Sequence, residues 1–396
     1  MENSLAASGP VRRVAIVHEW LVAFGGAELV LRELLKLFPQ ARVFTLVDSM
    51  DSAQRAFLGV GDTSSSFLNR LPGIDRRYRS MLPLFPAAVR SLDLRGFDVV
   101  ISNSHAVAKG VRVRPGQLHL SYCLTPMRYA WDLREQYLTE AGLSRGIRGI
   151  AARALLESLR RWDRANSTGV HGFATLSHFV ADRIRRSYSR EATVIYPPVD
   201  TEFFVPAGER SDYYVTASRF VPYKRVDLIA KAFSHLPDRK LVIVGDGPDA
   251  TKVRAAAGPN VTLAGHVERT ALRTLLQRAR AFLFAAEEDF GIAPLEAQAA
   301  GVPVIAYGRG GAAETVRGLD HPRPTGVHFA EQTADAIAAA VRQFEASADR
   351  ISAAACRENA ERFNEARFRD EFLRFVDAQW AAHAGSAAAL DTKVLI

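Results

Sequence analysis

Short apolar runs that alternate with longer amphipathic runs limit the fold of this chain more than any other feature. In the first half, six runs have the length and branched-residue content of buried strands: residues 12–20, 42–47, 97–102, 118–123, 172–177 and 193–196. Amphipathic segments with helical periodicity lie between several of them, at residues 27–38, 145–166 and 178–188. Alternating strands and helices predict a doubly wound parallel sheet with helices on both faces.

The second half of the chain repeats this alternation. Its predicted strands are residues 213–218, 240–244, 261–267, 281–286 and 303–307. Between the halves, Pro197-Pro198 excludes helix and keeps the chain extended, so we place the domain linker there. We therefore expect two Rossmann-like α/β domains that face each other across a cleft.

Four parts of the chain follow from this linker. The last predicted helix, at 366–384, has an apolar stripe that is typical of core packing, and the residues after it have none. The expected parts are an N-terminal domain at 1–198, a C-terminal domain at 199–365, a helix at 366–384 that packs back onto the N-terminal domain, and a frayed tail at 385–396.

Length and composition agree with a globular protein of two domains. The chain has 396 residues, of which 48% are hydrophobic and 24% charged, and these are ordinary values. No run reaches the roughly 18 apolar residues of a membrane span, and the first residues lack the apolar core of a secretion signal, so we expect a cytoplasmic protein. Cys123 and Cys356 have no partner motif and are predicted to be free thiols. No D-x-D triplet or His/Cys cluster indicates a metal.

The positive charge is concentrated in the first half. Residues 1–198 hold 27 basic and 17 acidic side chains, a net +10, whereas residues 199–396 hold 24 and 26, a net −2. Basic residues mix with apolar and aromatic ones at 70–90 and 145–164. This mixture favours peripheral attachment to an anionic membrane surface over a nucleic acid partner, and a solvated basic helix face is the alternative.

The most informative stretch is residues 287–315, where a predicted strand ends and a helix begins. Glu288 and Glu296 flank Phe290-Gly291, and Pro294 suits the first turn of a helix. The amino end of a helix favours an anion, and ionised carboxylates accept hydrogen bonds from sugar hydroxyls. The stretch therefore predicts a site for a polyol that carries phosphate. Acids that merely complement the helix dipole are the alternative.

This stretch resembles the signature of retaining family 4 glycosyltransferases of the GT-B fold. The match includes Glu288, Glu296 and the run 300–305, AGVPVI. The resemblance implies that Glu288 contacts the donor sugar and Glu296 the ribose. It also implies that the backbone of Phe290, Gly291 and Ile292 binds the sugar and diphosphate.

Two cations are expected to complete the donor site. Arg219 and Lys224 bracket a predicted turn between a strand and a helix, where they could neutralise a diphosphate, and the family uses this pair in that way. A basic surface turn is the alternative. By resemblance Arg219, Lys224 and Glu288 are the catalytic residues. The remaining expected donor contacts are Gly25, Gly26, Gly247, His266 and Val267.

The run 119–132, HLSYCLTPMRYAWD, resembles a subgroup that makes bacterial polysaccharides and O-antigens, often from GDP-mannose. The subgroup usually has histidine where Leu124 stands, and leucine cannot bond a sugar C6 hydroxyl. The donor is therefore expected to be GDP-mannose or, as a hypothesis, a 6-deoxyhexose nucleotide. His18, Glu19, Leu124 and Arg128 are expected near the acceptor or the donor sugar, and Arg128 in a structural ion pair is the alternative.

The resemblance implies metal-independent transfer with retention of configuration and no cofactor. The acceptor is expected to be lipid-linked or a polysaccharide precursor, and the protein is expected to bind it at the inner face of the cell membrane. Two other classes remain open. The run 245–250, GDGPDA, fits the dinucleotide fingerprint of an NAD-dependent oxidoreductase, and a non-catalytic sugar-nucleotide-binding or nucleic-acid-binding protein is the other. The oligomeric state is not predicted.

Overall fold

The computed structural model describes residues 12–394, without the side chains of residue 140 and residues 386–394. The chain divides into two compact units. Unit 1 holds residues 12–176, 180–195 and 369–394, and unit 2 holds residues 177–179 and 196–368. The chain passes from unit 1 to unit 2 just before Pro197-Pro198, close to the expected linker. The prediction about a secretion signal concerns mainly residues 1–11, which lie outside the described residues.

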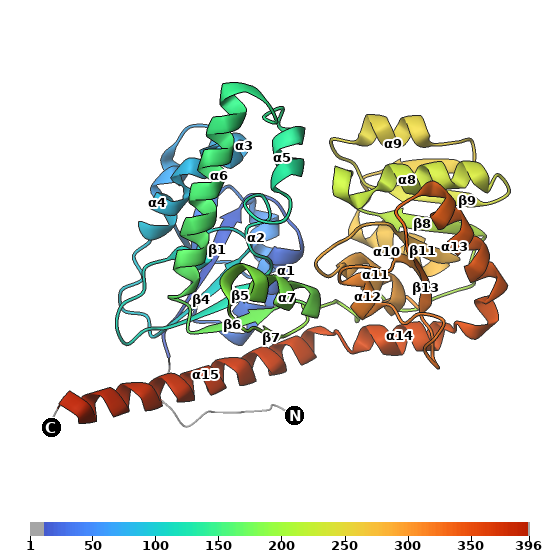
Figure 1. Ribbon diagram of the computed structural model, residues 1–396. Helices are drawn as coiled ribbons and strands as arrows, with labels where there is room; N and C mark the ends of the chain where they lie inside the picture. Colours follow the sequence, from blue (N-terminus) through green and yellow to red (C-terminus); the bar gives the residue numbers. More distant parts are fainter. Residues whose placement is uncertain (1–11, 395–396) are drawn as a thin grey trace. The chain divides into compact units, whose positions relative to one another are not determined.

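Unit 1 is built on a parallel sheet of seven strands in the order β3-β2-β1-β4-β5-β6-β7 (Figure 1). The strands are β1 Val14–Leu21, β2 Arg42–Asp48, β3 Thr63–Ser65, β4 Val99–Ser104, β5 Leu118–Cys123, β6 Gly172–Thr175 and β7 Thr193–Val194. The helices are α1 Gly26–Leu37, α2 Ser52–Leu58, α3 Ile74–Arg77, α4 Phe85–Arg90, α5 Arg134–Glu140, α6 Gly146–Ser167 and α7 His178–Tyr188. Strand β3 was not predicted, because this short edge strand is polar and leaves no apolar signal.

Unit 2 has a parallel sheet of six strands in the order β10-β9-β8-β11-β12-β13. The strands are β8 Tyr213–Ala217, β9 Lys240–Val244, β10 Val261–Gly265, β11 Ala281–Phe284, β12 Val304–Tyr307 and β13 Gly326–Phe329. The helices are α8 Val226–Ala232, α9 Ala250–Ala256, α10 Arg269–Arg278, α11 Ile292–Ala299, α12 Ala312–Thr315, α13 Ala334–Ala346 and α14 Ala353–Glu361. Strand β13 was also missed by the prediction.

The unit 2 sheet is buried on both faces. Alternate side chains of β11 enter two different apolar clusters: Leu283 packs in the cluster that contains α8 and α13, and Phe282 and Phe284 pack in the one that contains α11. Because successive side chains of a strand point to opposite faces, this division shows helices covering both sides. The two doubly wound α/β units that the alternating pattern predicted are therefore confirmed.

Helix α15, Glu365–Val394, returns the end of the chain to unit 1 and runs along it past β6 and β7 (Figure 1). Phe372 is fully buried with its ring 6.0 Å from that of Tyr122 on β5, and Arg369 pairs with the buried Glu33 of α1. The helix extends beyond the expected 366–384 into the segment expected to fray, where alanines favour helix. Residues 395–396 lie outside the described residues.

Candidate functional site

Lys224 and Glu288 meet in unit 2 at the carboxyl ends of two neighbouring strands. Lys224 lies in the connection after β8 and Glu288 in the connection after β11, and β8 pairs with β11. Their charged groups form an ion pair, with side chains only 18% and 14% exposed. Ligands of open α/β sheets bind at the carboxyl ends of strands, so the sheet topology places both predicted catalytic residues where a ligand is expected.

The loop that carries Glu288 is held by close backbone packing. Gly311 N–H donates to the Glu288 carbonyl over 2.8 Å, and a Cβ at Gly311 would lie 2.2 Å from the Cα of Phe290. The Phe290 ring packs 5.7 Å from Tyr196 and 5.8 Å from Phe363. The glycines at 310–311 thus make room for the loop itself, and the sequence analysis did not predict this function for them.

Helix α11 begins directly after this loop. Its N-cap is Gly291, whose φ of +88° is in the left-handed region that glycine adopts without strain. No acidic residue occupies the first turn and no side chain caps it. The first N–H groups of a helix have no partners within the helix, so this end favours an anion such as phosphate. The backbone of residues 290–292 therefore lies where the donor diphosphate was expected.

Glu296 lies on the second turn of α11. Burial raises its pKa to about 7, Arg269 lowers the pKa in part, and Asp200 raises it further. Arg269 itself donates to Asp200 over 2.7 Å. Some of the Glu296 side chain remains exposed, so a ligand hydroxyl could reach it. Near neutral pH this group is poised between its neutral and charged forms.

Arg219 is exposed and lies between β8 and Lys224. The next residue, Phe220, donates its N–H to the Asp246 carbonyl over 2.8 Å. A Cβ at Gly247 would lie 2.4 Å from the Phe220 carbonyl oxygen. Gly247 therefore makes room for the backbone that follows Arg219. In a dinucleotide fingerprint the second glycine leaves room for pyrophosphate instead, so this packing disfavours the NAD-binding alternative.

His266 and Val267 follow the edge strand β10 of unit 2. His266 is exposed and Val267 is half-buried. Gly265 before them has a φ of +68° and accepts a hydrogen bond from Gly245 N–H over 2.7 Å. This contact ties the end of β10 to the glycine turn after β9.

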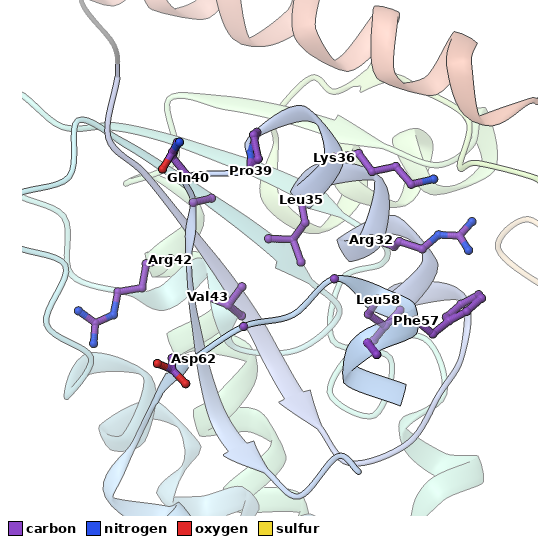
Figure 2. A pocket seen from close by; sticks show the side chains of 14 residues that line it. Arg32, Leu35, Lys36, Pro39, Gln40, Arg42, Val43, Phe57, Leu58 and Asp62 are labelled. Carbon is purple, nitrogen blue, oxygen red and sulfur yellow. The ribbon is translucent and has the colours of Figure 1, made fainter. Parts of the chain in front are cut away.

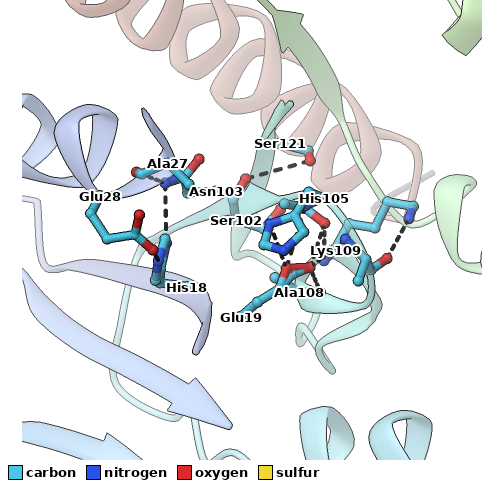
Figure 3. A network of polar contacts seen from close by, with 12 residues as sticks. His18, Glu19, Ala27, Glu28, Ser102, Asn103, His105, Ala108, Lys109 and Ser121 are labelled. Atoms are coloured by element: carbon cyan, nitrogen blue, oxygen red, sulfur yellow. Dashed lines mark hydrogen bonds and ion pairs between the residues drawn. The ribbon is translucent and has the colours of Figure 1, made fainter. Parts of the chain in front are cut away.

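In unit 1, the predicted residue Glu19 lies at the end of β1 and is completely buried. It accepts hydrogen bonds from the N–H groups of Ala106 and Ala108 at 2.7 and 2.9 Å, and from the Ser104 hydroxyl at 3.1 Å (Figure 3). His105 N–H is also in range at 3.3 Å. Glu19 therefore fixes the loop after β4, and it offers no surface to an acceptor.

His18 is also completely buried. Its Nε2 lies 3.1 Å from Oε1 of Glu28, on the first turn of α1, and its Nδ1 lies 3.1 Å from Nδ2 of Asn103, at the end of β4 (Figure 3). The predicted Gly25 and Gly26 form the N-cap and first residue of α1. Sequence reasoning missed Glu28 and Asn103, although both stand at strand-to-helix junctions.

Leu124 and Arg128 lie in the loop after β5. Leu124 is half-buried, and its N–H donates to the Ser104 carbonyl over 2.8 Å. Burial lowers the pKa of His105, which Glu19 opposes and the charge of Arg128 reinforces. This coupling places Arg128 close to His105. The structure thus gathers all four predicted acceptor-side residues near the loop after β4, but only Leu124 and Arg128 have exposed surface.

A pocket of about 750 Å³ lies elsewhere in unit 1 (Figure 2). It is lined by the last turns of α1, the start of β2 and residues 56–62, including Leu35, Arg42 and Asp62. This is the amino end of β2, opposite to the end at which ligands of such sheets bind. We assign it no part in the candidate site.

Within the described part of the chain, no group of three or more His, Cys, Asp or Glu side chains is placed to hold a metal ion. Among residues 12–394, no helix is long and apolar enough to cross a bilayer.

Comparison with known proteins shows which family model and which characterised enzymes the sequence resembles. Residues 200–363 match the family model of glycosyl transferases group 1. A GDP-mannose-dependent monoacylated alpha-(1-6)-phosphatidylinositol monomannoside mannosyltransferase from Corynebacterium glutamicum is 30% identical over 194 residues, which are 41% of this chain and 51% of that protein. The chain spans about half the length of the curated relatives it matches.

Solved structures match nearly the whole chain. Sucrose-phosphate synthase from Thermosynechococcus elongatus has a TM-score of 0.70 at 18% identity and covers 94% of this chain and 100% of its own. Anabaena HepE in complex with UDP and glucose has a TM-score of 0.63 at 15% identity and covers 93% and 100%. The expected GT-B fold is confirmed, residues 200–363 are similar to glycosyl transferases group 1, and the chain is related to mannosyltransferases.

Proposed function

We propose that this protein is a retaining, metal-independent glycosyltransferase of family 4. It transfers a hexose, with mannose from GDP-mannose favoured, to a hydroxyl group of a lipid-linked or polysaccharide-precursor acceptor. The observation that supports this most strongly is the Lys224–Glu288 ion pair beside the uncapped amino end of α11, within the region that matches the group 1 model. The GDP-mannose relative and the UDP-bound structural neighbour support a nucleotide sugar as donor.

The two charged groups suit opposite parts of such a donor. Lys224 supplies positive charge to the diphosphate, and the α11 dipole adds to it. Glu288, released from Lys224 when the donor binds, accepts hydrogen bonds from the sugar hydroxyls. Arg219 is exposed on the same connection as Lys224 and supplies a second cation.

The reaction breaks the bond between the anomeric carbon and the diphosphate oxygen, and the nucleoside diphosphate leaves with the electron pair. The acceptor oxygen forms its bond to the anomeric carbon on the same face. The acceptor proton passes to the departing phosphate oxygen. The enzyme's part is to stabilise the charge that grows on the diphosphate, and this lowers the barrier without an enzymic nucleophile.

The experiment is a donor panel with release of free nucleoside diphosphate as readout. Purified protein is incubated with GDP-mannose, UDP-glucose, UDP-galactose and a GDP- or dTDP-6-deoxyhexose, with and without octyl hexopyranosides as acceptors. We expect release from at least one donor, with GDP-mannose favoured. A protein that releases diphosphate from none of them would contradict the proposal, and NADH formation from a panel of sugar substrates would support an oxidoreductase instead.

Leu124 bears on the donor sugar. Its half-buried, apolar side chain would leave a C6 hydroxyl without a partner, at a cost of about 1–3 kcal/mol, whereas a C6 methyl group would pack against it. The hypothesis of a 6-deoxyhexose donor therefore stands beside GDP-mannose. Faster turnover of GDP-mannose than of either 6-deoxyhexose nucleotide would reject the hypothesis.

Peripheral attachment to an anionic membrane, at the inner face of the cell membrane, is part of the proposal. On α6, Ile147 and Ile150 are 87% and 69% exposed beside the exposed Arg145 and Arg148. Apolar side chains flanked by arginines suit the interface of an anionic bilayer. The 70–90 segment contributes less than expected, because Tyr78 and Phe85 are buried in the core.

Flotation with liposomes tests the membrane part. The wild-type protein should float with vesicles that contain 30% phosphatidylglycerol and less with phosphatidylcholine alone. Ile147→Asp combined with Ile150→Asp should abolish flotation while release of nucleoside diphosphate persists. Unchanged flotation of the double variant would remove α6 from the proposal.

A further inference from the structure

Unit 1 contains a chain of three polar side chains that the proposed donor chemistry does not use. Glu28 is 6% exposed, and His18 and Asn103 are completely buried. The three are joined by the His18–Glu28 and His18–Asn103 contacts, each 3.1 Å long (Figure 3). They come from the ends of β1 and β4 and from the first turn of α1. This is the carboxyl edge of the unit 1 sheet, where ligands of such folds bind.

The hydrogen bonds determine which atoms of Asn103, His18 and Glu28 donate and which accept. Nδ2 of Asn103 donates to the Ala27 carbonyl oxygen over 2.9 Å, and a carbonyl only accepts. The other proton of Nδ2 is therefore available to His18 Nδ1, which must accept it. The imidazole proton is then on Nε2 and is donated to Glu28 Oε1. The arrangement holds the Glu28 side chain in a single orientation.

Two acceptor atoms in this chain remain open. Oε1 of Glu28 contacts His18, and Oε2 forms no hydrogen bond or ion pair with the residues 12–394 that the structure describes. Oδ1 of Asn103 is buried and has no hydrogen-bond partner among the described residues. A buried acceptor without a donor, here Oδ1 of Asn103, is rare in folded proteins and marks a place where a water or a ligand belongs. A ligand that satisfies them must bring donors.

The charge of Glu28 decides which donors suit the site. Glu28 stands in the first turn of α1, where the helix would otherwise attract an anion. Its carboxyl group lies in that first turn without capping the helix, and a negative charge there opposes phosphate. Hydroxyl groups can donate to it without such repulsion. Gly25 and Gly26, the predicted donor contacts, lie at the start of this turn.

We propose that Glu28, oriented by His18 and Asn103, binds a hydroxyl group of the acceptor substrate. The part of the acceptor that enters at α1 is then an uncharged sugar unit, and any phosphate of the acceptor lies elsewhere. This inference rests on the proposed glycosyltransferase function. Glu28 is a binding residue, and His18 and Asn103 are positioning residues.

The test compares octyl mannoside, glucoside and galactoside with their 6-phosphates as acceptors, using the best donor of the panel. The wild-type enzyme should prefer the uncharged glycosides by at least about tenfold. Glu28→Gln should raise the acceptor KM about tenfold and shrink this preference below about threefold. The melting temperature of Glu28→Gln should match that of the wild type, so that the change in KM reports binding. Asp62→Asn, in the pocket at the amino end of β2, is the matched control.

Two further variants separate binding from folding. Gly25→Ala keeps all three side chains, and its φ of −166° suits any residue. Its Cβ lies 3.3 Å from Glu28 Oε2, so it should raise the acceptor KM without changing the melting temperature. His18→Gln retains a donor to Glu28 and should keep a lower acceptor KM than His18→Ala.

The outcomes separate this inference from the proposed function. Wild-type enzyme that transfers to none of the uncharged glycosides, or prefers the phosphates, would overturn the inference. So would folded Glu28→Gln and Gly25→Ala variants with wild-type acceptor KM and wild-type preference. Loss of diphosphate release from every donor would instead contradict the proposed function.

Discussion

The two units present the same junction with opposite chemistry. In each, a strand ends at the carboxyl edge of a parallel sheet and a helix begins at a glycine N-cap that no side chain caps, α1 at Gly25 and α11 at Gly291. The first turn of α1 contains Glu28, and the first turn of α11 contains no acid. A helix start without an acid in its first turn favours phosphate, whereas an acid in the first turn opposes it. This difference is the basis on which we propose a donor site in unit 2 and an acceptor site in unit 1.

The surrounding polar groups differ in the same way. In unit 1, Glu19 and His18 are completely buried and bonded to backbone or to other side chains. In unit 2, Lys224 and Glu288 are partly exposed and form an ion pair with each other, and a charged ligand can compete for both groups. Fully buried, hydrogen-bonded carboxylates shape a site, whereas charged groups that keep some exposed surface can exchange partners when a ligand binds.

The largest effect is expected at Lys224. Lys224→Met removes the cation beside the diphosphate and should lower kcat for diphosphate release by about 10²–10³-fold. Lys252→Met is the matched control. It breaks the ion pair of Lys252, whose side chain is 58% exposed, with Asp227 in the same unit, and it should change kcat less than about twofold. Steady-state kinetics with the best donor measure both. An equal loss of kcat in the two variants would show that the Lys224–Glu288 pair has no special part in diphosphate release.

Glu19 tests the structural side of the comparison. Glu19→Ala leaves the buried N–H groups of Ala106 and Ala108 without an acceptor and should lower the free energy of unfolding by about 3 kcal/mol. Urea unfolding followed by circular dichroism measures this change. The control Glu135→Ala removes a 68% exposed carboxylate of the same unit and should cost less than about 1 kcal/mol. If both variants were equally stable, the buried network of unit 1 would have no structural role.

Gly311 tests how firmly the unit 2 loop is held. Gly311→Ala places a Cβ 2.2 Å from the Cα of Phe290 and should destabilise the protein by about 2–3 kcal/mol while raising the donor KM. Gly385→Ala, on α15 with no atom within 4 Å of the added Cβ, should be neutral or stabilise by up to about 1 kcal/mol. Differential scanning calorimetry and donor kinetics measure both variants. A Gly311→Ala variant with wild-type stability would show that the loop yields easily.

The smallest effect is expected from Glu296, through pH. Its pKa of about 7 in the folded protein lies above the unfolded value of about 4.3, so the folded state holds the proton longer. The contribution of protonated Glu296 to the unfolding free energy is therefore fully present below about pH 4. It declines by about 1–2 kcal/mol as the pH rises through about 7. Glu296→Gln should remove this decline, so its unfolding free energy relative to wild type should rise between pH 5 and 8. A constant difference across that range would refute the raised pKa.

Particular residues show how far the sequence carried the prediction. The run 281–286 and its neighbours predicted the sheets, because apolar runs buried on both faces leave a strong local signal. Thr63–Ser65 gave no such signal and was missed. A family resemblance placed Glu288 and Lys224 in one predicted donor site, whereas their ion pair was not predicted. The roles of Glu19 and Gly311 were not, because each depends on contacts with residues remote in the chain, Ala106 and Phe290.

By itself the sequence determined two parallel α/β units, their boundary near Pro197 and the polar residues that stand at strand ends, because hydrophobic periodicity and proline act locally. Only the tertiary structure decided which of those polar residues are free to meet a ligand. Glu19, near the end of β1, is enclosed by backbone N–H groups, whereas Glu288, after β11, pairs with the partly exposed Lys224. Accessibility and charge pairing arise from segments that meet only after folding, and no local pattern records them.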